Sequence, residues 1–401
     1  MSKQLSLKDT ITSVLGFMKP LLADIRFWIL ILFIIRMVGI TNPPLETGHN
    51  WRQTTVAMVA RNFLEVDNNI LFPRIDIAGE LSGITGMEFP LLNYLIYLLS
   101  EIFGYQHWYG RLINLVVSSL GLWFFFKLTR KYFEENVSFY STIILGVSVW
   151  FQFSRKIMPD TFAVSLVIAG IYYGSNYLDG QEYKRRVLQL AGYIVLTILG
   201  ALAKLPAAYL LVLFSLLIFS KSVPFTRKLI LILTSFLILI PVWFWYYHWV
   251  PLLVEKYGFW HFFMGKSLPH GFAEILDDPG MVFKRFYDTA LKFIGFAVFL
   301  IGLSYAVIRK ERKLLAVFIL TFVGFSVVMF ASGNSFSKHD YYIIPFVPVM
   351  ALVAGYGLSL IRQKRIAWIF LLVIAVEGIA NQQHDLRGNS AKPGLLSLEE
   401  H

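Results

Sequence analysis

The chain contains no cysteine among its 401 residues, and only 15% of its residues are charged. The absence of cysteine excludes disulfide bonds, cysteine metal ligands and cysteine nucleophiles. The shortage of charge is unusual, because about a quarter of the residues of a soluble domain are charged. Hydrophobic residues make up 57% of the sequence, which favours a protein that crosses a membrane many times.

The N-terminal segment also lacks the pattern of a secretory signal peptide. Its basic residues are scattered, and no small-residue cleavage site follows its apolar run. We therefore expect residues 1–24 to form a cytoplasmic segment that leads into the first span. Residues 25–381 are expected to form one transmembrane domain, and the polar residues 382–401 a flexible tail.

Long apolar runs recur along the chain and predict transmembrane α-helices. Eleven runs begin near residues 25, 111, 136, 160, 187, 206, 228, 288, 314, 341 and 366. The predicted fold is therefore an all-α polytopic membrane protein of about 11 spans. The shorter apolar run 89–104 is interpreted as a juxtamembrane helix at the outer surface, because a crossing there would reverse the side of every later loop.

Five short loops carry much of the positive charge and predict the orientation. They lie at residues 127–131, 182–186, 221–228, 309–313 and 362–365, and all fall on the side of the N-terminus. The positive-inside rule makes that side cytoplasmic. The formal net charge of +11 is thus mainly a topology signal, and no nucleic-acid partner is expected. Two long loops, residues 41–110 and 249–287, then lie outside.

The run GHNWRQTT at residues 48–55 follows the first expected span. The apolar residues after it recur at helical spacing, which predicts an amphipathic helix beside the membrane with Thr54 or Thr55 as its cap. They are Val56, Val59, Ala60, Phe63 and Leu64.

The polar residues of this run are too many for a plain loop. A loop accounts for Trp51 as an interfacial anchor, but it explains less well the grouping of Glu46, His49 and Arg52. We interpret the group as the wall of a site, in which Trp51 stacks on a sugar or anchors the helix. Arg52 would bind phosphate or orient a carboxylate.

Two further outer corners carry charges. Asp160 follows Pro159, which favours a helix start, so its carboxylate is either a helix cap or a functional group. The cations Arg155 and Lys156 lie just before it, and two cations with a carboxylate would suit an anionic lipid headgroup. Lys204 interrupts an apolar run, where it either snorkels to the surface or serves a site.

Polar residues also precede two apolar runs. Lys338, His339 and Tyr342 open the tenth span and suit phosphate, although Asp340 could simply pair with Lys338. Glu88 precedes the juxtamembrane helix and could bind sugar hydroxyls, act as a base or cap the helix. Two other charged residues, Arg36 and Glu377, lie within expected spans without an assigned role.

Histidines in the outer loops raise the question of a metal site. No HxxxH or HxH spacing occurs, so the sequence does not indicate one. Metal dependence stays open, and no organic cofactor is expected.

The order of these features resembles the GT-C membrane glycosyltransferases, in particular their protein-mannosyltransferase-like and aminoarabinose-transferase-like branch (glycosyltransferase family 39-like). The resemblance covers about residues 25–360. It rests on ARNF (60–63) after the first span, an apolar segment ending in FG (103–104), MPD (158–160), the lone Lys204, and a lysine followed by YxxP (342–345).

The resemblance implies a glycosyltransferase of the bacterial inner membrane with a site facing the periplasm. Such enzymes pass a sugar from a polyprenyl-phosphate donor to a lipid, glycan or protein acceptor with inversion. A carboxylate deprotonates the acceptor, and fixed cations stabilise the leaving phosphate. Membrane lipids are the other expected partners. Asp160, Lys204 and the Lys338–Tyr342 region match family positions. The expected donor phosphate ligands are Arg52, Arg155, Lys204, Lys338, His339 and Tyr342.

One departure from the family pattern concerns the base. Relatives carry an Asp-Glu pair eight residues before the alanine of ARxF, and here that count falls on Arg52. No aspartate occurs between residues 41 and 66. The candidates for the base, in order, are Glu46, Asp160 and His49, with Glu88 as a further carboxylate.

Two other functions fit an outer-facing lipid-linked substrate. A flippase or transporter would place polar groups at mid-membrane in both halves of the chain, whereas here the charges gather at outer corners. A glycan polymerase shares the substrate and is harder to exclude.

Overall fold

The computed structural model describes residues 20–44, 48–180, 182–218, 223–258 and 265–381. The described residues are almost entirely helical, and their only β-pairing is an isolated bridge between Arg74 and Ile84. The expected tail 382–401 and most of the expected N-terminal segment 1–24 lie outside the described residues.

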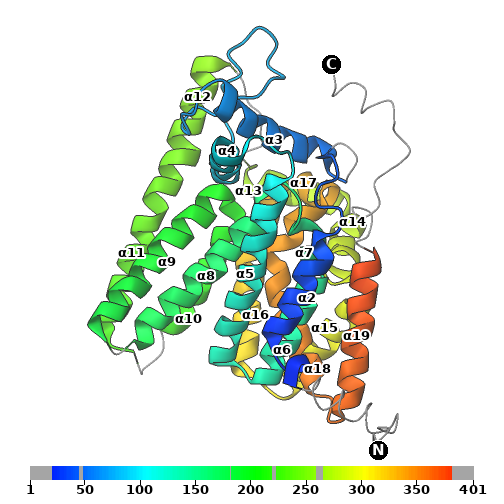
Figure 1. Cartoon of the computed structure of the whole chain (residues 1–401). Coiled ribbons are helices and arrows are strands. Elements are labelled where there is room, and N and C mark those ends of the chain that lie inside the picture. The colour runs from blue at the N-terminus through cyan, green and yellow to red at the C-terminus, as the bar shows by residue number, and fades with distance from the viewer. Residues whose placement is uncertain (1–19, 45–47, 181, 219–222, 259–264, 382–401) are drawn as a thin grey trace, which may run out of the picture.

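Long helices form a bundle (Figure 1). These helices are α2 (Ile25–Met37), α5 (Tyr109–Tyr132), α6 (Glu135–Val147), α8 (Pro159–Asp179), α9 (Tyr183–Ala203), α11 (Phe225–Trp243), α15 (Lys292–Ile308), α16 (Arg312–Ser332), α18 (Val347–Ser359) and α19 (Lys364–Asn381).

Shorter elements connect or cover the bundle. The α-helices among them are α3 (Asn50–Glu65), α4 (Leu91–Phe103), α7 (Val149–Phe153), α10 (Phe214–Ile218), α12 (Val250–Tyr257), α13 (Leu268–Asp277), α14 (Pro279–Lys284) and α17 (Asn334–Lys338). Two 3₁₀ stretches are η2 (Leu205–Leu213) and η5 (Asp340–Phe346), and two π stretches are η3 (Phe244–Trp249) and η4 (Arg285–Ala290).

A helical element begins within a few residues of each expected span start. By length and composition, however, only five described helices are able to cross a membrane, or six if the pair Pro279–Ala290 and Lys292–Ile308, bent by 96°, forms one span. The others are short or carry more polar residues; α2 and α6, for example, have 13 residues each, fewer than the roughly 20 that span a bilayer. The polytopic helical fold is thus confirmed, while the count of 11 stays a prediction.

The short basic loops meet at one end of the bundle, called here the basic end. Lys131 pairs with Asp179 of the next hairpin at 2.7 Å, and Arg227 donates to the Leu178 carbonyl at 2.8 Å. Lys313 lies 3.4 Å from the Tyr132 carbonyl oxygen. Loops far apart in the sequence therefore share one side, as the positive-inside reading requires, although the side itself stays a prediction.

The opposite end, called here the α3 end, is covered by α3 and α4, which lie across the bundle (Figure 1). The apolar face predicted for α3 is confirmed, since Val56, Val59, Ala60 and Phe63 are buried. The predicted cap is wrong. The helix begins at Asn50, and the hydroxyls of Thr54 and Thr55 donate to carbonyls one turn back.

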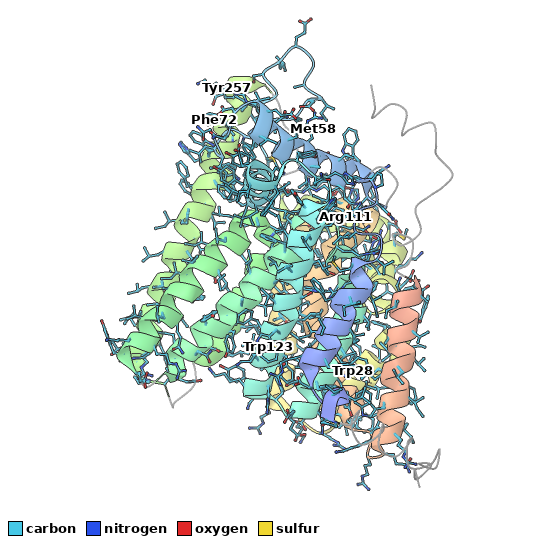
Figure 2. The ribbon with its side chains drawn as sticks, viewed as in Figure 1. Trp28, Met58, Phe72, Arg111, Trp123 and Tyr257 are labelled. Carbon is cyan, nitrogen blue, oxygen red and sulfur yellow. The ribbon has the colours of Figure 1, made fainter. Side chains whose placement is uncertain are left out.

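Aromatic side chains lie toward both ends of the bundle. Figure 2 shows Trp28 and Trp123 toward the basic end, and Phe72 and Tyr257 at the α3 end with their ring centroids 6.4 Å apart. Aromatic side chains at two levels are typical of membrane interfaces. Arg111, labelled just below α3, donates to the Gln53 side chain and to the Ile40 carbonyl, which ties α5 to α3.

Close packing of α5 against α8, and of α6 against α18, holds the centre of the bundle together. A Cβ on Gly121 of α5 would lie 2.5 Å from Ser165 Cβ on α8, and a Cβ on Gly355 of α18 would lie 2.6 Å from the Ser141 nitrogen on α6. Small residues at these crossings let helix backbones approach closely, as is common in membrane bundles. The starts of α8 and η5, which carry site residues, are thereby held in place.

The two charges inside expected spans have structural roles. Arg36 is fully buried and donates to Ser154 Oγ at 2.6 Å and to the Leu32 carbonyl of its own helix. Glu377 accepts from the Ile294 nitrogen at 2.9 Å, in the first turn of α15.

Candidate active site

An ion pair between Arg52 and Glu88 joins α3 to the segment before α4. Both side chains are nearly buried, with 11% and 9% of their surface exposed. Burial by itself raises the pKa of Glu88, but the charges of Arg52 and Lys204 outweigh it, and the pKa falls below its ordinary 4.5. Glu88 is therefore a carboxylate held ionised by Arg52, and it does not cap α4, whose N-cap Pro90 has no side-chain cap bond.

A second pair forms where α8 begins and α9 ends. Asp160 lies in the first turn of α8, and its Oδ1 is 3.8 Å from Lys204 Nζ. Lys204 adopts an extended conformation between α9 and η2 and turns inward, 5.8 Å from the Tyr341 ring centroid. The helix-cap reading of Asp160 is wrong, because Met158 is the N-cap and Pro159 occupies the first position.

One oxygen of Asp160 is left available for chemistry. Asp160 is only 4% exposed, and its Oδ2 has no hydrogen-bond partner among the described residues. A buried carboxylate oxygen without a partner is uncommon in proteins and points to a ligand or a proton acceptor role. Glu88, by contrast, is engaged by Arg52.

His49 connects three elements at the start of α3. Its Nδ1 lies 2.6 Å from Lys156 Nζ, and its Nε2 lies 2.7 Å from Asp340 Oδ1. Since the lysine ammonium only donates, Nδ1 accepts, and the Nε2 proton is donated to Asp340. Both ring nitrogens are therefore used, and His49 adopts a left-handed backbone (φ 62°) that these contacts hold.

These three groups form one polar cluster, defined as Arg52, Glu88, Asp160, Lys204, His49, Lys156 and Asp340. Glu88 and Asp160 each interact electrostatically with both Arg52 and Lys204. The ring of Tyr341 contacts the cluster from η5, 5.9 Å from the His49 ring centroid. Three cations and three carboxylates thus gather at the α3 end of a membrane protein.

A cavity of about 190 Å³ adjoins the cluster. Its polar lining side chains are those of Glu88, Lys204, Tyr246, Ser332 and Tyr342, and the rest of the lining comes largely from α16 and η2. Tyr246 donates to the Leu202 carbonyl at 2.8 Å. The cavity therefore presents a carboxylate, an ammonium and phenol groups to a bound molecule.

The other site residues predicted from the sequence do not belong to the polar cluster. Trp51 is 67% exposed. Arg155 is turned to the end of α2, where it donates to the Val38 carbonyl at 2.6 Å. Lys338 and His339 are exposed, with the His339 ring stacked on Tyr341. Glu46 lies outside the described residues.

The alternative that Asp340 pairs with Lys338 is not what the structure shows, and of the two neighbouring cations only Arg155 was predicted as a site residue. The salt bridges of the described residues include no Lys338–Asp340 pair; Asp340 binds His49 instead. Lys156 is 1% exposed and its Nζ lies 4.8 Å from the Phe153 ring centroid. The signal available in the sequence was a second cation beside Arg155, two residues before the MPD motif.

Metal ligands do not gather in the described part of the chain. It contains no group of three or more histidine, aspartate or glutamate side chains able to hold a metal ion.

Comparisons with known proteins bear on the fold. A family model described as dolichyl-phosphate-mannose-protein mannosyltransferase matches residues 88–246, which include Glu88, Asp160 and Lys204. The structure of ArnT from Cupriavidus metallidurans bound to undecaprenyl phosphate matches 88% of this chain with a TM-score of 0.56 and 14% identity. The chain has the GT-C glycosyltransferase fold.

A second GT-C structure supports the same fold. It is the oligosaccharyltransferase AglB from Archaeoglobus fulgidus, in complex with an inhibitory peptide and a dolichol-phosphate, with a TM-score of 0.52 and 13% identity over 90% of this chain. The chain spans 63% of the ArnT chain and 55% of the AglB chain. No curated protein matches the chain.

Proposed function

We propose that this protein is a membrane glycosyltransferase that moves a sugar from a polyprenyl-phosphate donor to a lipid, glycan or protein acceptor. The observation that carries the proposal is the polar cluster beside a cavity at the α3 end of a GT-C fold. Its charges are buried, and buried charges are costly unless they serve structure or chemistry. We place the site on the periplasmic face of a bacterial inner membrane, because the basic loops lie at the other end.

Asp160 is proposed as the general base. Its unpartnered Oδ2 takes the proton of the acceptor hydroxyl, and the acceptor oxygen then attacks the anomeric carbon. The bond between that carbon and the donor phosphate oxygen breaks, and the phosphate keeps the electron pair. Attack from the face opposite the leaving group inverts the anomeric centre. Glu46 and His49 remain alternatives for the base, although both nitrogens of His49 are already engaged.

Cations of the cluster are proposed to stabilise the leaving phosphate. Lys204 is the first candidate because it lines the cavity, and Arg52 and Lys156 are the other cations of the cluster. Fixed cations in a site that excludes water stabilise developing charge strongly. Tyr342 lines the same cavity and could donate to a phosphate or a sugar hydroxyl. Lys338, His339 and Arg155 stay candidate phosphate ligands, and Trp51 and Glu88 candidate sugar ligands.

The experiment that tests this function is a transfer assay in proteoliposomes. Radiolabelled polyprenyl-phosphate sugars would be supplied with a bacterial lipid extract as the acceptor source. Label that leaves the carrier and appears singly on an acceptor supports the proposal. Label that crosses the bilayer on an intact carrier indicates a flippase, and label added as a growing chain indicates a polymerase; either result rejects the proposal.

A further inference from the structure

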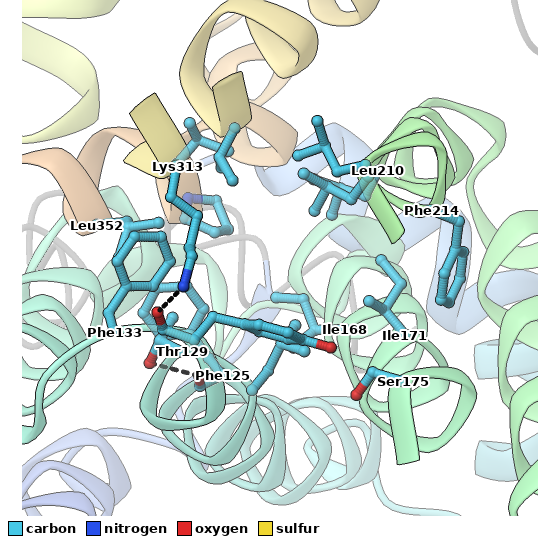
Figure 3. Close-up of a pocket in the computed structure, with 17 residues that line it drawn as sticks. Phe125, Thr129, Phe133, Ile168, Ile171, Ser175, Leu210, Phe214, Lys313 and Leu352 are labelled. Carbon is cyan, nitrogen blue, oxygen red and sulfur yellow. Dashed lines mark hydrogen bonds between the residues drawn. The ribbon is translucent and has the colours of Figure 1, made fainter. Parts of the chain in front are cut away.

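A second and larger cavity lies at the basic end of the bundle. It has a volume of about 360 Å³ and lies between α5, α8, η2, α10, α16 and α18 (Figure 3). Its wall is mainly apolar, formed by side chains such as Phe125, Ile168, Leu210, Phe214 and Leu352. None of its lining residues belongs to the polar cluster, so this cavity is separate from the proposed active site.

The shape of the cavity suits a hydrocarbon chain. Lining residues run from Phe125 to Tyr132 on α5 and from Ile168 to Ser175 on α8. Seven residues of α-helix rise about 10 Å, so the cavity extends along the helix axes. An apolar cavity of about 150 Å³ already binds benzene, and this one is more than twice as large.

Polar groups also line the cavity. Ser175, Thr129 and Lys313 are among its lining residues, and Figure 3 shows the ammonium of Lys313, an exposed residue, on the Thr129 side of the cavity, across from Ser175. Lys131 reaches Ser175 Oγ at 3.2 Å, but its charge is balanced by Asp179 at 2.7 Å.

The charge of Lys313 is not balanced in the same way. Its Nζ is 3.4 Å from the Tyr132 carbonyl oxygen, and no carboxylate of the described residues lies within salt-bridge distance. An apolar cavity with an uncompensated ammonium in its lining is complementary to an amphiphile with an anionic head.

We propose that this cavity binds one acyl chain of an anionic phospholipid, with the phosphate of its headgroup at Lys313. The basic end faces the headgroups of one leaflet, and juxtamembrane lysines attract anionic lipids. A zwitterionic phospholipid fits less well, because it carries a cation of its own next to Lys313. The lipid lies against η2 and α16, the same elements that border the cavity of the polar cluster.

The test is photo-crosslinking of the full-length protein in phosphatidylcholine vesicles that contain phosphatidylglycerol with a diazirine in its acyl chain. The wild type is compared with Lys313→Gln and with the control Arg312→Gln. Both residues are exposed cations in the first turn of α16, but only Lys313 lines the cavity. Because both side chains are exposed, both variants are expected to fold.

We expect labelled peptides from α5, α8, α16 and α18, with about fivefold less labelling in Lys313→Gln, the factor that one lysine contributes near an anionic surface. Arg312→Gln is expected to label like the wild type. The proposal is overturned if the label falls only outside the cavity, if the two variants label equally, or if a phosphatidylcholine probe labels the cavity as strongly. Since the readout is labelling, the result does not depend on sugar transfer.

Discussion

The side chains of His49 and Asp340, 291 positions apart in the sequence, are joined by a hydrogen bond of 2.7 Å between Nε2 and Oδ1. With Lys156 on the other ring nitrogen, this contact fixes the start of α3 against the starts of η5 and α8. The first turn of α3, which carries Arg52, is thereby held within the polar cluster.

Removing Asp340 is expected to loosen the start of α3. In Asp340→Ala the Nε2 proton of His49 loses its acceptor, and the left-handed backbone at His49 loses a contact that holds it. Hydrogen exchange of the amides in residues 48–53 should become faster, while α18 stays protected. The control is Asp288→Ala, which removes another partly buried carboxylate at this end. Unchanged exchange at residues 48–53 would show that the contact does not hold α3.

The buried pair of Arg52 and Glu88 predicts a non-additive effect on stability. Arg52→Met or Glu88→Leu alone leaves a buried charge without its partner and should cost about 3–5 kcal/mol. The double variant should recover most of this loss, since neither member of the pair then remains as a buried charge that has lost its partner. Thermal unfolding in detergent measures the effect.

An exposed ion pair that includes a residue of α3 serves as the matched control. Arg61 pairs with Asp76, but both side chains are well exposed, at 44% and 40%. Arg61→Met and Asp76→Leu should each cost less than about 1 kcal/mol. Equal losses at the two pairs would contradict the role assigned to burial.

The lowered pKa of Glu88 predicts how stability depends on pH. Because its pKa in the folded protein is below its ordinary 4.5, ionised Glu88 stabilises the fold fully above pH 4.5. This stabilisation is lost as the pH falls through the lowered pKa. The unfolding temperature of the wild type should therefore fall more steeply below pH 4.5 than that of Glu88→Gln. Parallel curves would mean that Glu88 does not gain its charge stabilisation on folding.

Lys204 is expected to matter for the donor phosphate. Lys204→Gln removes a cation that lines the cavity and should weaken binding of a polyprenyl phosphate about tenfold or more, the typical value of a charge-assisted hydrogen bond. Titration of a fluorescent polyprenyl phosphate measures the affinity. Lys284→Gln serves as the control, because Lys284 pairs with Asp288 and does not line the cavity. Equal affinity for Lys204→Gln and the wild type would remove Lys204 from the donor site.

Local features of the fold were accessible from the sequence. Helical periodicity identified the buried face of α3, including Val56 and Phe63, because a helix repeats its environment every few residues. Apolar runs marked the helix starts, and basic loops marked one end of the bundle. Charges at loop corners identified Glu88, Asp160 and Lys204 as site candidates before their geometry was known.

The pairs of site side chains could not be predicted from the sequence, because they depend on the tertiary arrangement. Arg52 and Glu88 are 36 positions apart, and His49 and Asp340 come from opposite halves of the chain. Arg155 and Lys156 are adjacent, yet one turns to the Val38 carbonyl and the other to His49, and no sequence pattern distinguishes two neighbours in a turn. The start of α3 at Asn50 depends on the contacts of His49, which also come from distant segments.

The central claim is that Asp160 is the base of a sugar transfer at the α3 end. It is tested most directly by comparing Asp160→Asn with Asp179→Asn, which removes a carboxylate at the basic end. Asparagine keeps the shape of aspartate but cannot accept the proton. We predict that Asp160→Asn binds polyprenyl phosphate normally and transfers sugar roughly a hundredfold more slowly or worse, while Asp179→Asn keeps wild-type transfer. Sugar transfer by Asp160→Asn at the wild-type rate would contradict the account.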